Sequence, residues 1–159
     1  MSLQEGLADP IRIKARTSRW VPGTRHAYSN SGPVVAAYVV EKISHQKFED
    51  FVQKHFFNPL QMNSSTFFKT EYYLQHAAIP YLDNKPQEYA QVYSRPSSSL
   101  NSSPADMAQL LTFFIQKGSI NNQIVLSPES IQSMQTPQTT LGAEQGIASG
   151  YGLTLQIFG

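Results

Sequence analysis

The sequence contains no cysteine, and only 14% of its 159 residues are charged. The absence of cysteine excludes disulfide bonds, thiol catalysis and thiolate metal sites. Twelve basic and 11 acidic residues give a formal net charge of +1, so the composition offers no electrostatic basis for binding nucleic acid or an anionic membrane surface. No apolar run approaches the roughly 18 residues that a membrane-spanning helix requires. A globular domain with a core of its own is the class that these absences leave.

Several catalytic and metal-binding motifs are also missing. The sequence has no Gly-x-Ser-x-Gly nucleophile turn, no glycine-rich phosphate loop and no His-Glu-x-x-His zinc helix. The N-terminus does not show the basic and apolar regions of a secretory signal peptide. Metal-ligand spacing is absent from the four histidines, which are His26, His45, His55 and His76. We therefore expect no metal site.

Apolar periodicity predicts helices in the first half of the chain. Residues 34–40 form an apolar run that we interpret as a helix that starts near Pro33. A second helix is predicted to end at Asn58-Pro59. Its apolar face repeats at helical spacing and consists of Phe48, Phe51, Val52, His55 and Phe56. Residues 1–20 and 60–101 show no sustained period.

The second half carries two strong helix-start signals. Ser103-Pro104-Ala105-Asp106 and Ser127-Pro128-Glu129 each combine a serine cap, a proline and an acid in the first turn. We expect Gly118 and Pro137 to end these helices. The apolar face of the first comprises Met107, Leu110, Leu111, Phe114 and Ile115. Alternation from Tyr151 to Phe158 predicts a strand, with Tyr151, Leu153, Leu155 and Ile157 on its apolar face.

Two segments imitate motifs of serine hydrolases. Ser44-His45-Gln46-Lys47 has the Ser-x-x-Lys spacing, which on a helix places a lysine one turn after a nucleophilic serine. The segment falls at the break between two predicted helices, so we reject it as a nucleophile. Lys69-Thr70-Glu71 imitates a Lys-Thr-Gly strand, but glutamate replaces the glycine that lets substrate approach the backbone. We discount this segment as well.

Tyr28-Ser29-Asn30 is the segment that most indicates chemistry. On an extended segment, alternate residues face the same side, so Tyr28 and Asn30 would point a phenol and a carboxamide into one cleft. A phenol is a poor base at neutral pH unless a nearby cation, such as a lysine, favours its ionised form. Asn30 offers a donor and an acceptor to an amide-bearing substrate. The alternative is a turn with a structural tyrosine and an asparagine that caps the following helix.

The surroundings of this segment resemble those in one family. Pro22-Gly23-Thr24 precedes Tyr28-Ser29-Asn30, and a glycine and an apolar helix follow it. Segments 48–52, 59–62, 98–108, 126–130 and 150–153 then come in the order typical of that family. It is the serine β-lactamase and penicillin-binding-protein-like family, which includes class C β-lactamases, D,D-peptidases and related esterases. The resemblance runs from about Trp20 to the C-terminus.

The resemblance implies an α+β chain that is a mainly helical fragment of the β-lactamase/transpeptidase-like fold with a C-terminal β-strand. By position, Tyr28 would be the catalytic tyrosine that assists proton transfer to and from the nucleophile and leaving group. Asn30 would orient the lysine of the nucleophile motif and the substrate amide. The family transfers acyl groups to a serine from β-lactams, D-alanyl peptides or small esters, without metal or organic cofactor. The expected partner is thus a small-molecule or peptide substrate and not nucleic acid, in a bacterial periplasm or cell envelope.

Two of the family's catalytic elements are not in this sequence. The family places Ser-x-x-Lys well upstream of the tyrosine, and Lys-Thr-Gly or His-x-Gly shortly after a strand like 150–153. We therefore expect residues 21–159 to be part of a β-lactamase-like domain that is inactive alone. Residues 1–20 are expected to be an N-terminal extension, partly derived from cloning.

Other interpretations remain open at this stage. A non-catalytic binding or assembly module derived from the same family would also lack the nucleophile. An unrelated helical domain with accidental matches is the third. In a fragment, the apolar strand face near the C-terminus would have few partners within the chain, and its edges would invite pairing with another copy. We therefore also expect self-association through this strand.

Overall fold

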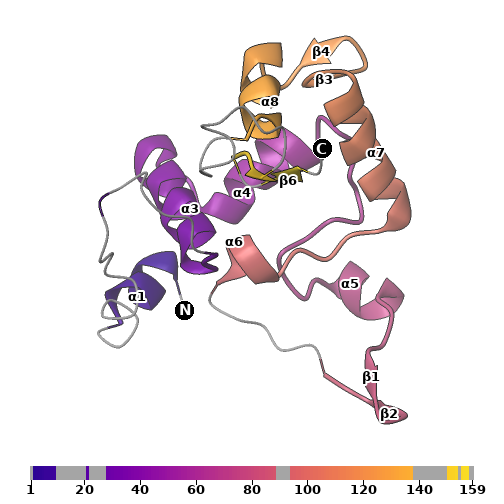
Figure 1. The fold of residues 1–159 in the computed structure, drawn as a ribbon. Coiled ribbons are helices and arrows are strands. Elements are labelled where there is room, and N and C mark those ends of the chain that lie inside the picture. The colour runs from indigo at the N-terminus through magenta and orange to yellow at the C-terminus, as the bar shows by residue number, and fades with distance from the viewer. Residues whose placement is uncertain are drawn as a thin grey trace. The chain divides into compact units, whose positions relative to one another are not determined.

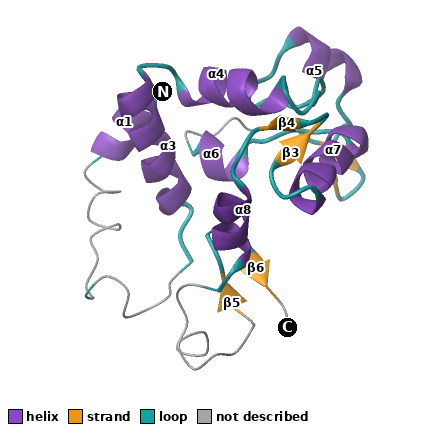
Figure 2. Ribbon diagram, turned by 90° about the horizontal axis from the view of Figure 1, so that it is seen from above, coloured by secondary structure: helices purple, strands orange, loops and turns teal. Residues whose placement is uncertain are grey.

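A computed structural model describes residues 2–9, 21, 28–88, 94–137, 150–153 and 155–157. The chain divides into two compact units, with residues 1–16 and 30–108 in unit 1 and residues 17–29 and 109–159 in unit 2. Most of the described residues with regular structure are helical, and the strands form short two-stranded pairs (Figures 1 and 2). Within the described residues, no helix combines the length and the apolar character needed to cross a membrane.

Unit 1 is a group of short helices. Its elements are α1 (Leu3–Ala8), α3 (Ser31–Ser44), α4 (Phe48–Val52), the π-helix η1 (Gln53–Phe57), α5 (Glu71–His76), β1 (Tyr81–Leu82), β2 (Lys85–Pro86) and α6 (Arg95–Ser98). Helix α3 packs against α1, α4 and α6 (Figure 1). The Glu41 carboxylate of α3 accepts a 3.0 Å hydrogen bond from the first amide of α4, which satisfies a donor that the helix itself leaves open.

The core of unit 1 has two neighbouring parts. Leu3, Val34 and Ala37 are buried together, with Leu7, Tyr38 and Phe48 packed against them. The Phe48 ring also reaches Phe67, with ring centroids 5.5 Å apart, and Phe67 stacks on Phe57 at 5.8 Å. Leu60 and Met62 are buried as well. Phe48, the first residue of α4, therefore contacts both the Leu3–Val34–Ala37 cluster and the Phe57–Phe67 pair.

Helix α1 lies in the region for which periodicity predicted no element. Ser2 caps it reciprocally with Glu5: the Glu5 amide donates to the Ser2 hydroxyl at 3.2 Å, and the Ser2 amide donates to the Glu5 carboxylate at 2.7 Å. Because Leu3 is 1% exposed, this helix contributes to the core. The pattern Ser2-x-x-Glu5 is a capping box, which is a helix-start signal in the sequence. The helix that follows it is too short for its apolar residues to show a helical period.

Helix α7 (Pro104–Ile115) runs from unit 1 into unit 2. Unit 2 continues with β3 (Ser119–Ile120), β4 (Gln123–Ile124), α8 (Pro128–Gln135), β5 (Gly150–Tyr151) and β6 (Gln156–Ile157). Both predicted helix starts are confirmed, because the Ser103 hydroxyl accepts from the Asp106 amide and the Ser127 hydroxyl accepts from the Ser130 amide. Among the described residues of this unit, the buried apolar side chains are Phe113, Ile120 and Ile131.

Gly118 ends α7 in a way that only glycine permits. Its φ is +92°, and its amide donates to the Phe113 carbonyl at 2.9 Å. A Cβ placed there would lie 2.2 Å from the Leu126 carbonyl oxygen, which is part of the backbone. The predicted end of the helix is therefore confirmed, and the glycine is required both by conformation and by the close approach of the returning chain.

The predicted apolar face of α7 is wrong in part. Met107, Leu111 and Ile115 are 38%, 61% and 79% exposed, whereas Phe113, which the prediction left out, is fully buried. The helix is apolar over much of its circumference, so the periodic pattern could not decide which side faces the core.

The second predicted helix is confirmed, but its face is shifted. The chain changes to a π-helix at Gln53, and the Asn58 amide donates to the Gln53 carbonyl, five residues back. This wider turn rotates the following side chains, so Phe57 becomes buried and His55, predicted on the apolar side, is exposed.

The C-terminal β structure is confirmed as a hairpin and not as one continuous strand. Gly150 pairs with Ile157 and Tyr151 pairs with Gln156 in antiparallel register. Leu153 lies at the bend and is 52% exposed. Since the chain reverses between β5 and β6, the expected single strand with one apolar face from Tyr151 to Ile157 does not form.

Candidate functional site

Tyr28 and Asn30 belong to different units of the chain. Tyr28 is 78% exposed and belongs to unit 2, whereas Asn30 belongs to unit 1. Asn30 precedes α3 with an αR backbone, and its side chain makes no capping hydrogen bond to that helix. Asn30 is thus the N-cap residue of α3, as the alternative interpretation expected, although not through a side-chain hydrogen bond to that helix. The mutual geometry of the two side chains stays a prediction, and residues 22–27 of the same motif, His26 included, lie outside the described residues.

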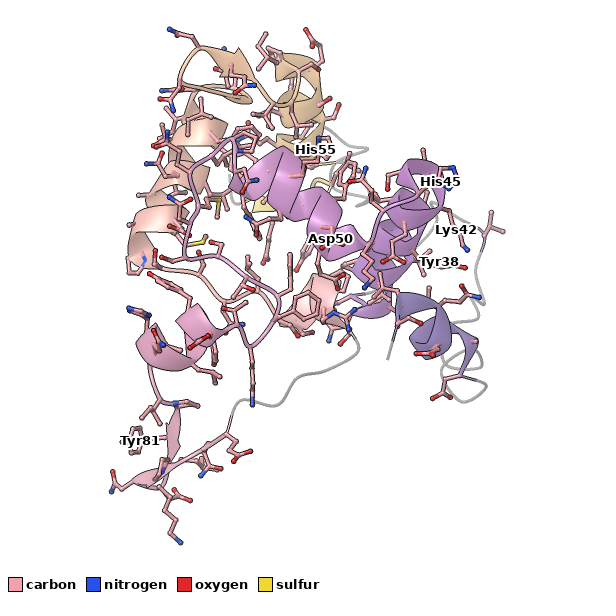
Figure 3. The ribbon with its side chains drawn as sticks, turned by 180° about the vertical axis from the view of Figure 1, so that it is seen from behind. Tyr38, Lys42, His45, Asp50, His55 and Tyr81 are labelled. Carbon is pink, nitrogen blue, oxygen red and sulfur yellow. The ribbon has the colours of Figure 1, made fainter. Side chains whose placement is uncertain are left out.

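The Ser44–Lys47 segment does not have the geometry of a nucleophile motif. Ser44 is the last residue of α3, and its hydroxyl donates to the Val40 carbonyl at 2.7 Å. His45 adopts a left-handed conformation with φ 56°, and Lys47 is extended before α4. Figure 3 shows His45 at the end of α3. Because the helix ends between them, Lys47 is not one helical turn beyond Ser44, and the rejection of this segment is confirmed.

Lys69-Thr70-Glu71 is likewise not a strand motif. Thr70 caps α5, with its hydroxyl accepting from the Tyr73 amide at 3.0 Å, and Glu71 is the first residue of that helix. Thr70 therefore stands at the start of a helix, where its hydroxyl serves as a cap, and not on the edge of a strand. The decision to discount this segment is confirmed.

The described histidines are spread over separate elements. The His55 ring packs on Phe51 with centroids 4.5 Å apart, and the His76 ring stacks on Tyr72 at 4.2 Å. Among the residues that the structure describes, no group of three or more histidine, aspartate or glutamate side chains could hold a metal ion.

Asp106 organises the loop of small residues before α7, residues 98–103, which we call the small-residue loop. Its carboxylate Oδ2 accepts from the Ser64 amide at 2.8 Å and from the Ser65 hydroxyl at 2.7 Å. The Ser65 hydroxyl also lies 2.8 Å from that of Ser102. Asp106 is only 5% exposed. Sequence reasoning assigned Asp106 to the first helical turn alone, since its partners lie about forty residues earlier in the chain.

Glu49 and Arg95 form a second buried polar contact that the sequence did not predict. The Arg95 Nε donates to the Glu49 Oε1 at 2.5 Å, with side chains 12% and 5% exposed. The Arg95 guanidinium also lies over the Phe68 ring, 5.3 Å from its centroid. This ion pair ties α6, and with it the start of the small-residue loop, to α4.

A family described as Beta-lactamase matches residues 10–159. The chain belongs to the β-lactamase family. This match includes Tyr28-Ser29-Asn30 and every segment on which the resemblance was based.

Solved structures agree with this membership. The octameric penicillin-binding protein homologue from Pyrococcus abyssi is 28% identical with a TM-score of 0.75, over 96% of this chain and 34% of that chain. A β-lactamase/D-alanine carboxypeptidase from Pseudomonas syringae, 17% identical with a TM-score of 0.65, covers 78% of this chain and 35% of its own and shows the shared fold. The α+β β-lactamase/penicillin-binding-protein fold predicted for the chain is thus confirmed.

A curated relative gives a shorter match. Protein flp of Staphylococcus aureus (strain MW2) is 30% identical over 84 residues, which are 53% of this chain and 16% of that protein. The chain thus spans about a third of the length of the structural relatives, and its match covers about a sixth of the curated relative.

Proposed function

We propose that this chain supplies the Tyr-x-Asn element of the acyl-transfer site of a β-lactamase-like serine hydrolase. Tyr28 assists proton transfer at the nucleophile and the leaving group, and Asn30 orients the lysine of the nucleophile motif and the substrate amide. The observation that carries the proposal is the β-lactamase family match over residues 10–159, which includes both residues. The substrates are β-lactams, D-alanyl peptides or small esters, and the name of the relative from Pseudomonas syringae, a β-lactamase/D-alanine carboxypeptidase, is in line with the first two.

The 159 residues are proposed to be inactive by themselves. Their single Ser-x-x-Lys segment is Ser44–Lys47, and its serine is held by a carbonyl at a helix end. The nucleophile and the Lys-Thr-Gly or His-x-Gly strand would come from further residues of a β-lactamase-like domain. The exposure of an apolar stripe on α3 supports this view, since Val35, Val39 and Ile43 are 46%, 48% and 76% exposed at successive turns of one helix.

Hydrolysis assays test the inactivity of the chain. The purified chain should hydrolyse neither nitrocefin nor p-nitrophenyl acetate above the rate of a Ser44→Ala variant. A serine-dependent rate in the chain that the Ser44→Ala change removes would contradict the proposal.

The complete reading frame that contains these residues tests the role of the tyrosine. The proposal expects a Ser-x-x-Lys before residue 1 and a Lys-Thr-Gly or His-x-Gly after residue 159. In the protein made from that frame, Tyr28→Phe should lower kcat by about 10²–10⁴. The matched control is Tyr38→Phe, which removes a tyrosine hydroxyl outside the Tyr-x-Asn motif. Tyr38 is a half-buried residue of α3, and the Lys42 Nζ atom lies 4.9 Å from the centroid of its ring (Figure 3). Equal rates for the two variants would show that Tyr28 has no catalytic role.

The second candidate is a non-catalytic binding or assembly module of the same family, and the exposed apolar stripe on α3 favours it equally. A reading frame that has neither a Ser-x-x-Lys nor a Lys-Thr-Gly or His-x-Gly motif would support the module.

For either function we propose self-association of the isolated chain, through the α3 stripe or the edges of the β5–β6 hairpin. Light scattering should show a mass that rises with concentration, and a strict monomer would contradict this. We further propose a periplasmic or cell-envelope location, which fractionation of cells expressing the complete frame tests.

A further inference from the structure

A cleft of about 430 Å³ lies within unit 1, and neither Tyr28 nor Asn30 is among the residues that line it. One part of its wall comes from α5 and the residues after it, and the other part comes from Ser64 and the small-residue loop. The lining residues that carry the inference are Ser64, Tyr72, His76, Leu100, Asn101 and Ser102. Clefts of this size hold small organic ligands in many proteins.

The polar wall of the cleft is held in place by the surrounding fold. Ser64 is fixed through its amide, which donates to the buried Asp106 carboxylate at 2.8 Å. Ser102 is linked to the same carboxylate through the Ser65 hydroxyl. Asn101 is fixed by two backbone hydrogen bonds with Thr66, each 2.9 Å long. The donors and acceptors on this wall are therefore positioned before any ligand arrives, which lowers the entropic cost of binding.

The aromatic wall is formed by two stacked rings. The Tyr72 and His76 ring planes are inclined by 19° with centroids 4.2 Å apart. Tyr72 is joined to the polar wall, since its hydroxyl lies 3.1 Å from that of Ser64. The His76 Nδ1 lies 2.9 Å from the Tyr72 carbonyl oxygen, an acceptor, so in the neutral ring Nδ1 carries the proton and Nε2 is an acceptor. Half of the Tyr72 surface remains exposed.

We propose that this cleft binds a neutral saccharide of one or two pyranose rings. Of the described residues that line it, none is an aspartate, glutamate, lysine or arginine, so the lining contains no fixed charge to recognise an ionic ligand. A pyranose ring has an apolar face that packs on an aromatic side chain and a rim of hydroxyl groups that both donate and accept. The Tyr72–His76 wall meets the first requirement. Serine hydroxyls and the Asn101 carboxamide meet the second.

Nuclear magnetic resonance titration of the 159-residue chain tests the proposal. Methyl β-D-glucopyranoside and cellobiose should produce saturable shifts of the amide signals of α5 and of residues 100–103, with millimolar dissociation constants. Tyr72→Ala should weaken binding by about tenfold. Tyr81→Ala is the matched control and should leave it unchanged, because Tyr81 is an exposed tyrosine on the β1–β2 hairpin and not part of the lining (Figure 3).

Three results would overturn the proposal. The first is the absence of saturable shifts with either sugar in a chain whose spectrum is that of a folded protein. The second is binding that Tyr72→Ala and Tyr81→Ala weaken equally. The third is a neutral capped dipeptide that saturates the same signals at lower concentration than cellobiose, which would assign the cleft to peptides. Tyr72→Phe, which keeps the stacked ring and loses the hydroxyl, should retain most of the affinity even if Tyr72→Ala lowers stability.

Discussion

Replacing Asp106 by alanine tests whether one buried carboxylate organises the loop before α7. Two hydrogen bonds to its Oδ2 would be lost, from the Ser64 amide and the Ser65 hydroxyl. A hydrogen bond to a charged group contributes about 1.5–3 kcal/mol. Ser65 keeps its contact with the Ser102 hydroxyl, so its loss is partly compensated. We therefore expect the free energy of unfolding to fall by about 3 kcal/mol in Asp106→Ala and by about half as much in Asp106→Asn, which retains an acceptor oxygen.

Urea unfolding followed by circular dichroism measures this loss, and native-state hydrogen exchange localises it. The Ser64 amide should exchange much faster in Asp106→Ala than in the unchanged chain. The control is Asp50→Ala, an exposed acid in the first turn of α4, where the loss should stay below about 1 kcal/mol. An Asp106→Ala variant that unfolds like the control, with an unchanged Ser64 exchange rate, would refute the role assigned to the carboxylate.

Three further substitutions test other parts of the fold. Gly118→Ala should lower the free energy of unfolding in urea by about 3 kcal/mol, because φ is positive and the new Cβ would lie 2.2 Å from the Leu126 carbonyl oxygen. Gly32→Ala, where the new Cβ would have no atom within 4 Å, should be neutral or slightly stabilising, and equal effects of the two changes would contradict this. Arg95→Met should lower the unfolding free energy by about 3 kcal/mol because it leaves the 5% exposed Glu49 side chain unpaired, and adding the Glu49→Gln change should recover part of the loss. Hydrogen bonds with the backbone and then with the hydroxyl of Ser2 lower the pKa of Glu5 from 4.5. The stabilisation of α1 by the Glu5 carboxylate is therefore present above pH 4.5 and is lost as the pH falls through the lowered pKa. Hydrogen exchange of the α1 amides should show this loss in the unchanged chain and not in Glu5→Gln.

Helices with strong local signals could be predicted from the sequence. Ser103 and Ser127 cap α7 and α8 as expected, because capping is decided by the side chain and the amides of the next turn. The capping box of α1 was equally local but was overlooked. The turns of the two hairpins were overlooked as well, although Asp83-Asn84 and Asn121-Asn122, all with positive φ, are residues that favour such turns.

Features that depend on distant partners could not be predicted. Asp106 and Ser64, like Glu49 and Arg95, are more than forty residues apart in the chain, and nothing near either residue indicates the other. Packing determines the π-helical turn at Gln53 and the side of α7 that is buried, which carries Phe113. The periodic pattern is compatible with more than one buried side of such a helix.

The sequence alone was enough to propose Tyr28 and Asn30 as site residues, and their roles stay a prediction. Tyr28-Ser29-Asn30 could be found because it stands among ordered family segments, and the family match includes it. The Ser44–Lys47 segment could be rejected because a helix break removes the spacing that a lysine needs beside a serine. A three-residue motif does not encode how the Tyr28 and Asn30 side chains face one another.

Intact-mass spectrometry of the 159-residue chain after incubation with a penicillin tests whether these residues contain a nucleophile. We propose that they carry the tyrosine and asparagine of a β-lactamase-like site but not its nucleophile. The mass should therefore stay unchanged, with no acyl adduct at any serine. A stoichiometric penicilloyl adduct on Ser44 that disappears in Ser44→Ala would contradict it, because the chain would then contain a nucleophile of its own.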